Sequence, residues 1–272
     1  MNRLEKQMVS ILEDLKANYS VTGVKAEFEA EGTRMEEAMR LKEVSMCAGL
    51  GMTLKIGGCE AIKDMFEAGS LGVKHLVAPM VETAYALKKY LGAVDIAFSE
   101  EDQADVDFLI NLETITAVAN FDAMLALPAI RGLRGVVVGR VDLTGSMGLD
   151  RSSVNGEQIF AITKEVAEKC KVHGLEMVVG GAVSVHSMPF FQALPYITRF
   201  ETRKVVFSCP GALKNPEAAF LKAVEFELLW LKNKKNYYGC IHREDDIRLT
   251  MMEERYRLSI EAISGRAGET KS

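Results

Sequence analysis

The chain has 272 residues, of which 48% are hydrophobic and 26% are charged. This composition excludes a disordered chain and is sufficient for a full hydrophobic core. A net charge of −5 argues against a general binder of nucleic acid or of anionic membranes. The longest apolar runs, such as Gly135–Gly139, are far shorter than the roughly 20 residues that cross a membrane, so we expect a soluble, cytoplasmic protein.

Residues 1–18 have the spacing of a helix, and after them short runs rich in Val and Ile alternate with longer helical segments. This alternation is typical of βαβ units around a parallel sheet. The predicted strands are Val24–Glu29, Met52–Gly57, His75–Val81, Asp107–Glu113, Gly135–Asp142, Glu176–Ala182 and Arg199–Phe207. The predicted helices between them are Thr33–Ala48, Cys59–Ala68, Thr83–Leu91, Thr114–Ala126, Gly156–Val172 and Ser187–Leu194. No linker interrupts residues 20–210, so we predict an α/β fold, a (β/α)8 TIM barrel over residues 1–210, although only seven strands are visible.

The chain becomes helical after Pro210, with amphipathic spacing in Pro216–Asn233 and Arg243–Ser264. We therefore predict a C-terminal helical extension over residues 211–272, in addition to the barrel. A long terminal helix with an apolar stripe often packs on a neighbouring subunit, so we expect a homo-oligomer.

Charged residues alternate with apolar ones in several predicted strands. Side chains along a barrel strand point in turn to the helix layer and to the interior, so the apolar set identifies the outer face. The rule sends Glu27 and Glu29 inward from the first strand, Lys55 from the second and Glu113 from the fourth. It also groups further polar residues on one side of their strands, namely Asn111, Arg140, Asp142, Arg199, Glu201 and Arg203.

This arrangement gives the predicted interior more carboxylates than cations. An unpaired buried carboxylate costs several kcal/mol, so such a cluster must be paired, hydrated or bound to a metal. Mg²⁺ typically takes one or two protein carboxylates and fills its other positions with water and substrate oxygens. Glu113 and Asp142, near the strand ends where barrel active sites lie, are the candidate ligands. A Glu or Asp at a strand end, taken alone, is more often a helix N-cap, an ion-pair partner or a solvated side chain than a metal ligand.

Three segments resemble the HpcH/HpaI aldolase and citrate lyase β-subunit family. They are Ile110-Asn111-Leu112-Glu113-Thr114, Val138-Gly139-Arg140-Val141-Asp142-Leu143-Thr144, and Ala68–Gly72 leading into Val77–Thr83. The resemblance covers roughly residues 23–182 and implies a phosphoenolpyruvate/pyruvate-type barrel.

The resemblance also implies chemistry. In the family one Glu and one Asp hold Mg²⁺ or Mn²⁺, and these positions match Glu113 and Asp142, with backbone amides at Val141 and Asp142 assisting. The metal binds a pyruvate-like 2-keto acid and stabilises the enolate of carbon–carbon cleavage. The implied function is a metal-dependent, class II-type aldolase.

Three residues depart from the family pattern. Lys55 stands where the family usually has an Arg, and it would orient the substrate carboxylate without clamping it. The segment after Glu27 and Glu29 lacks the usual His, which leaves Glu31 as an acid/base candidate if neighbouring carboxylates raise its pKa, with His186 as another. Arg140, together with Arg199 and Arg203, suggests that the second substrate, an electrophile, is anionic.

Other functions stay open at this point. A citryl-CoA or malyl-CoA type lyase uses the same metal pair on a thioester. A Schiff-base aldolase would require a depressed pKa at Lys55, which the flanking glutamates oppose. A barrel that binds a metabolite without turnover is also compatible with the missing histidine.

Overall fold

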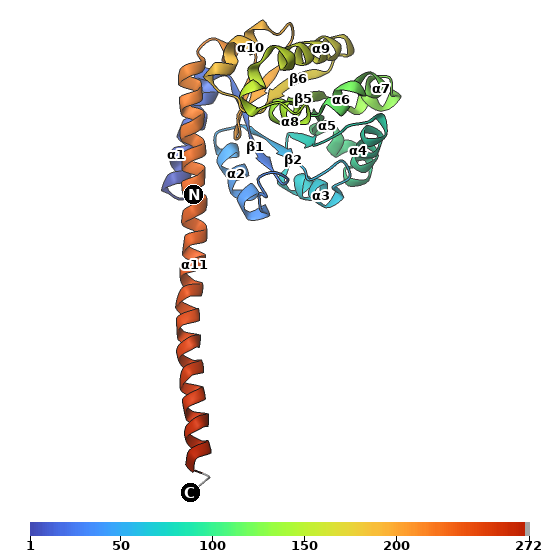
Figure 1. Ribbon diagram of the computed structural model, residues 1–272. Helices are drawn as coiled ribbons and strands as arrows, with labels where there is room; N and C mark the ends of the chain where they lie inside the picture. The colour runs from blue at the N-terminus through green and yellow to red at the C-terminus, as the bar shows by residue number, and fades with distance from the viewer. Residues whose placement is uncertain (270–272) are drawn as a thin grey trace. The chain divides into compact units, whose positions relative to one another are not determined.

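Eight strands close into a barrel in the computed structural model, which describes residues 1–269 (Figure 1). The strands follow one another around the barrel in chain order. They are β1 (Val21–Glu27), β2 (Gly51–Lys55), β3 (His75–Ala78), β4 (Asp107–Leu112), β5 (Gly135–Gly139), β6 (Glu176–Gly180), β7 (Arg199–Glu201) and β8 (Val205–Ser208). The predicted TIM-barrel class is therefore confirmed.

The last strand differs from the other seven. Strands β1 to β7 are parallel, whereas β8 runs antiparallel to both β7 and β1 and closes the barrel. The predicted single strand Arg199–Phe207 was wrong: it is a hairpin, with Thr202 donating and accepting hydrogen bonds with Val205 at the turn. The eighth strand was missed because no helix precedes it.

Helices surround the barrel, mostly one after each strand. Several begin at side chains that accept a backbone N–H, as Thr83 and Thr114 do, and α3 and α9 end at left-handed glycines, Gly72 and Gly174. The helices of the barrel are α1 (Arg3–Tyr19), α2 (Met35–Cys47), α3 (Ile62–Leu71), α4 (Ala84–Ala97), α5 (Glu100–Asp105), α6 (Ile115–Ala119), α7 (Phe121–Leu125), α8 (Arg140–Ser146), α9 (Glu157–His173) and α10 (Met188–Ala193). The predicted helix over 114–126 is two short helices that meet at Asn120.

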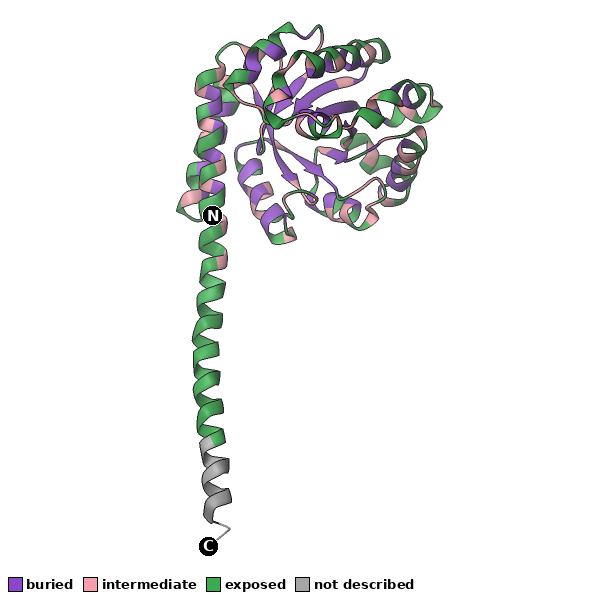
Figure 2. Cartoon of the chain, in the orientation of Figure 1, coloured by how far each residue is buried: buried purple, intermediate pink, exposed green. Residues whose placement is uncertain are grey.

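The core has two parts because strand side chains alternate. Outward-facing residues such as Leu54, Leu76 and Val136 are fully buried beneath the helices. Inside the barrel, a buried apolar cluster fills the middle: Val77, Leu109, Val137 and Val178. Figure 2 shows this buried zone running along the strands. The apolar layer separates the polar residues at one end of the interior from those at the other.

Helix α11 (Pro216–Glu269) runs from the barrel unit into a second unit. The chain divides into Met1–Glu227 and the part from Leu228 onward. The two predicted terminal helices are one continuous helix, since residues 234–242 between them are also helical. Every residue from Gly239 to Ile260 is exposed (Figure 2). Positions 270–272 of the predicted extension lie outside the described residues, and no described helix is long and apolar enough to span a membrane.

Candidate active site

A cavity of about 720 Å³ opens at the carboxyl ends of the parallel strands. Active sites of (β/α)8 barrels lie at this end, because the loops that follow the strands converge there. Its charged lining comprises six carboxylates and four cations: Glu27, Glu113, Asp142, Glu201, Glu217 and Glu227 with Lys25, Lys55, Arg151 and Arg203. The cavity thus has an excess of carboxylates.

Glu113 directly follows β4, and its side chain is almost completely buried. One carboxylate oxygen accepts the backbone N–H of Met80 at 3.0 Å, and the other accepts the Asn111 amide at 2.7 Å. Met80 has a left-handed backbone with φ of 50°, a strained conformation that aims its N–H at this carboxylate. A Cβ at Gly139 would lie 2.7 Å from Glu113 Oε2, so only glycine leaves room for this side chain.

Asp142 lies in the first turn of α8 and lines the same cavity as Glu113. Burial raises the pKa of Glu113, and the Asp142 carboxylate adds to the rise, against the lowering effect of Lys55, Asn111 and the Met80 N–H. The two carboxylates are thus close enough to repel each other. A cation between them would relieve this repulsion.

The donor set fits a divalent cation that takes few protein ligands. Among residues 1–269, no group of three or more His, Cys, Asp or Glu side chains is placed to hold a metal. Two carboxylates with water and substrate oxygens are the usual surroundings of Mg²⁺. The buried Asn111 Oδ1, beside Glu113 on the cavity wall, has no hydrogen-bond partner, so an acceptor oxygen is available to a ligand.

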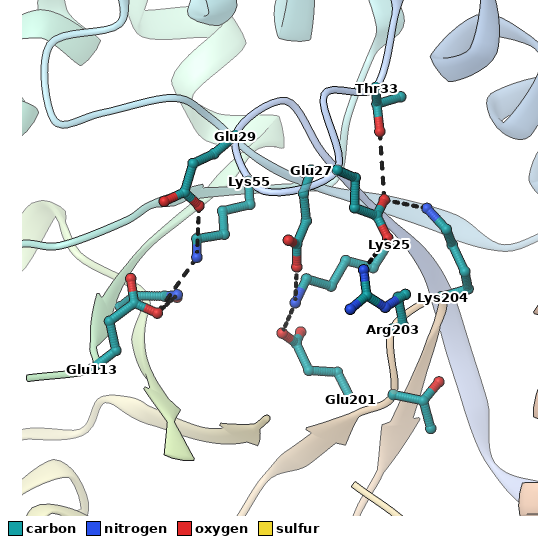
Figure 3. Close-up of polar contacts among 12 residues, drawn as sticks. Lys25, Glu27, Glu29, Thr33, Lys55, Glu113, Glu201, Arg203 and Lys204 are labelled. Carbon is teal, nitrogen blue, oxygen red and sulfur yellow. Dashed lines mark hydrogen bonds and ion pairs between the residues drawn. The ribbon is translucent and has the colours of Figure 1, made fainter. Parts of the chain in front are cut away.

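Lys55, at the end of β2, points into the cavity between two carboxylates (Figure 3). Its ammonium lies 2.9 Å from Glu29 and 3.4 Å from Glu113. Burial alone would lower the pKa of Lys55, but Glu113, Glu29 and Glu27 outweigh it and raise that pKa. Lys55 is therefore protonated at neutral pH and disfavours imine formation.

A second buried cation, Lys25, lies between Glu27 and Glu201 (Figure 3). The Lys25–Glu27 distance is 2.8 Å, and Lys25 also donates to Glu201. Burial alone would raise the pKa of Glu27, but Lys25, Lys55 and Arg203 outweigh it and lower that pKa, so Glu27 stays ionised. Lys25 was not predicted as a site residue, although it has the same strand parity as Glu27.

Arg140 does not face the cavity, and its predicted inward orientation was wrong. Strand β5 ends at Gly139 and α8 begins at Arg140, so strand alternation no longer applies there. The guanidinium is fully buried over the rings of Phe190 and Phe191, with Cζ 4.9 and 5.0 Å from their centroids. All five of its N–H groups are used, by Val154 O, Asn155 Oδ1, Gly180 O, Gly181 O and Ser187 Oγ.

Glu31 is also placed differently from the expectation. Its neighbours are the cations Lys204 and Arg203, not carboxylates, and it does not line the cavity. Arg199 points to the opposite end of the barrel, where it pairs with Glu176 at 2.7 Å. Arg203 does line the cavity, and the exposed His186 does not. Val141 and Asp142 both contribute to the cavity wall, as expected.

Comparisons with known proteins agree with the barrel fold. The sequence model of the HpcH/HpaI aldolase/citrate lyase family matches residues 55–187, from the last residue of β2 to the loop after β6. The resemblance predicted from the sequence motifs is thus confirmed for this part of the barrel. The family match supports a lyase-type function for the chain.

Solved structures share the fold at low sequence identity. A HpcH/HpaI aldolase/citrate lyase family protein from Burkholderia cenocepacia J2315 superimposes with a TM-score of 0.56 and 14% identity, over 74% of this chain and 93% of that one. The citrate synthase SbnG gives a TM-score of 0.55 and 14% identity, over 84% of this chain and 99% of that one. No curated protein matches the sequence. These similarities support the architecture and do not identify a substrate.

Proposed function

We propose that the chain is a divalent-metal-dependent carbon–carbon lyase that forms or cleaves a 2-keto acid through a pyruvate enolate. The observation that carries the proposal is the pair Glu113 and Asp142, two electrostatically interacting carboxylates at one cavity in a barrel of the HpcH/HpaI family. Mg²⁺ or Mn²⁺ held by this pair would supply Lewis-acid polarisation of the substrate oxygens.

The residues around Glu113 favour the binding of an anionic substrate. Asn111 and the Met80 N–H fix the Glu113 carboxylate from both of its oxygens. Lys55 keeps a positive charge within 3.4 Å of Glu113, where it attracts the carboxylate of a 2-keto acid and stabilises negative charge on the enolate. No histidine lines the cavity, so the methyl proton would pass to a cavity carboxylate or to water.

Exchange of the pyruvate methyl protons in D₂O tests this function without knowledge of the second substrate. We expect exchange, followed by proton NMR, to require Mg²⁺ or Mn²⁺ and to stop when a chelator is added. Glu113→Gln and Asp142→Asn should each lower the rate at least about 100-fold, the order expected for loss of one charge-stabilising group. Glu157→Gln is the matched control, because Glu157 is exposed on α9 outside the cavity.

The other outcomes identify the alternatives. Exchange that persists in chelator or in Glu113→Gln would refute a metal role for this pair. Absence of exchange with pyruvate, together with exchange of an acyl-CoA thioester, would indicate a citryl-CoA or malyl-CoA type lyase. Pyruvate binding without exchange of either compound would indicate a metabolite-binding barrel.

A further inference from the structure

Four aliphatic side chains line the part of the cavity formed by the loop after β6 and the start of α11, which we call the outer half. The loop after β6 contributes Val183 and Val185, and the first turns of α11 contribute Leu221 and Val224. Leu221 and Val224 are 72% and 62% exposed, so both side chains are accessible to a ligand in the cavity. Small-molecule sites typically combine such apolar walls with a few fixed polar groups.

Both apolar walls are held by features of the fold. Phe220 stacks on Phe200, with centroids 5.9 Å apart, and this fixes the start of α11 against the β7–β8 hairpin. The loop after β6 turns through Gly181 and Ala182, which have φ values of 82° and 49°. A Cβ at Gly181 would lie 2.7 Å from Val141 N, so the loop packs directly on the turn that carries Asp142. The walls are therefore built into the site.

The volume also exceeds what pyruvate requires. A cavity of about 720 Å³ lies within the range of roughly 300–1,000 Å³ that accommodates drug-sized ligands. Pyruvate placed at Glu113 and Asp142 would leave the outer half free. That space is available to the second reactant.

The charges at the outer half do not favour an anion. Glu217 and Glu227 face it together with Arg151 and Arg203, two of each sign. Arg203 lies 3.5 Å from Glu31 and 3.9 Å from Glu227, so its charge is already compensated. Apolar contact is the main interaction that this half offers.

We propose that the acceptor of the enolate is an aldehyde with an apolar chain or ring, which binds between Val183/Val185 and Leu221/Val224. This inference rests on the proposed lyase function. In the synthetic direction the pyruvate methyl carbon loses a proton and bonds to the aldehyde carbon, whose oxygen gains a proton. The product is a 4-hydroxy-2-keto acid with an apolar tail, and cleavage is the reverse.

The test is a series of straight-chain aldehydes, from acetaldehyde to heptanal, reacted with pyruvate. We expect kcat/KM to rise about three- to fourfold for each buried methylene. Leu221→Asp should flatten this series, so that the ratio of kcat/KM for heptanal to kcat/KM for acetaldehyde falls toward one; this ratio cancels any change that is common to all aldehydes. Leu249→Asp, an exposed leucine of the same helix outside the cavity, is the matched control. A flat series in the unmodified protein, or a slope that Leu221→Asp does not alter, would overturn the proposal.

A binding series separates this inference from the lyase function. Calorimetry with straight-chain 2-keto acids, from pyruvate to 2-oxooctanoate, measures binding without turnover. Kd should fall with chain length in the unmodified protein and should not do so in Leu221→Asp. Methyl exchange without chain-length dependence in either series would refute the apolar subsite and retain the lyase. If Leu221→Asp changes only the oligomeric state in light scattering, the exposed leucine covers a second copy and the proposal fails.

Discussion

The two ends of the barrel interior both contain buried charges, but only one of them resembles a site. At the carboxyl end of the strands, carboxylates outnumber cations around a cavity of about 720 Å³. At the amino end, His75, Arg199 and Glu176 fill the interior, and the void beside His75 and Arg199 is about 10 Å³. Between them lies the apolar layer around Leu109.

The amino-end charges compensate one another. Arg199 lies 2.7 Å from Glu176, which also accepts from Arg134 at 2.8 Å. His75 contacts Thr53 at 3.2 Å and Arg199, and burial, with Arg199, Lys74 and Arg134, lowers its pKa to about 3. Buried charge alone therefore does not mark a functional site. Charged side chains that lack a full set of opposite charges and line a cavity are a better indication of a functional site.

Removing one cation from each end gives the largest expected contrast. Lys55→Met should lower pyruvate exchange at least about 100-fold, because a charge beside the reacting region is lost. Arg199→Met should leave exchange per folded molecule unchanged but cost about 3 kcal/mol of unfolding free energy, since Glu176 and its neighbours lose a buried partner. Denaturant unfolding and NMR exchange measure the two effects. A lower exchange rate in folded Arg199→Met would refute the prediction that the charges at the amino end have no part in the reaction.

Gly139→Ala tests the fixed position of Glu113. The added methyl group would lie 2.7 Å from Glu113 Oε2 and 2.9 Å from its Cβ, so the side chain must shift. A misplacement of a catalytic group by about 1 Å typically lowers the rate about 100-fold. We therefore expect Gly139→Ala to lower the rate of pyruvate methyl exchange about 100-fold. Gly145→Ala in α8 is the control, because its Cβ meets nothing within 4 Å. Equal activity of the two variants would refute a tight fit at Gly139.

His75 should make stability depend on pH. Its pKa is about 3 in the folded protein and about 6.5 when unfolded, so the folded protein binds fewer protons and loses stability as pH falls below 6.5. Between pH 8 and pH 5 this loss should reach about 2 kcal/mol. His75→Gln should remove it, as measured by denaturant unfolding at both pH values. An identical loss in His75→Gln would place its origin elsewhere.

The smallest expected effect is that of borohydride, which should trap no covalent adduct between Lys55 and pyruvate. Because neighbouring glutamates raise the pKa of Lys55, borohydride with pyruvate should leave the mass of the protein unchanged. Mass spectrometry checks this. An adduct on Lys55 that Lys55→Arg abolishes would instead support a Schiff-base aldolase.

Strand alternation predicted the site well wherever a strand was regular. Asn111, Glu113 and Lys55 face the cavity as expected, because period-2 geometry holds throughout β2 and β4. The rule failed at Arg140, one residue after β5 ended and helical geometry began. Asp142 still reaches the cavity, but from the first turn of a helix. Glu31 failed similarly, because it lies after the end of β1.

Other parts of the site had no local signal. Leu221 and Val224 come from a helix more than 35 residues beyond β6, and only the stacking of Phe220 on the hairpin brings them to the cavity. The eighth strand was equally hidden, because Arg199–Phe207 has one continuous β pattern that does not reveal the turn between Thr202 and Val205.

The sequence predicted the barrel, its first six strands and the spacing of Glu113 and Asp142, because these depend on periodicity and on local residue spacing. Only the tertiary structure decided which charges are compensated and which are not. In the folded protein, the buried Arg140 donates hydrogen bonds to Asn155 and Gly181, which lie on two different loops. Glu31 pairs with cations, and two groups of aliphatic side chains line the cavity that contains the carboxylates. Whether a charged side chain is neutralised depends on its distance from charged residues on elements far apart in the chain. Local sequence patterns do not predict that distance.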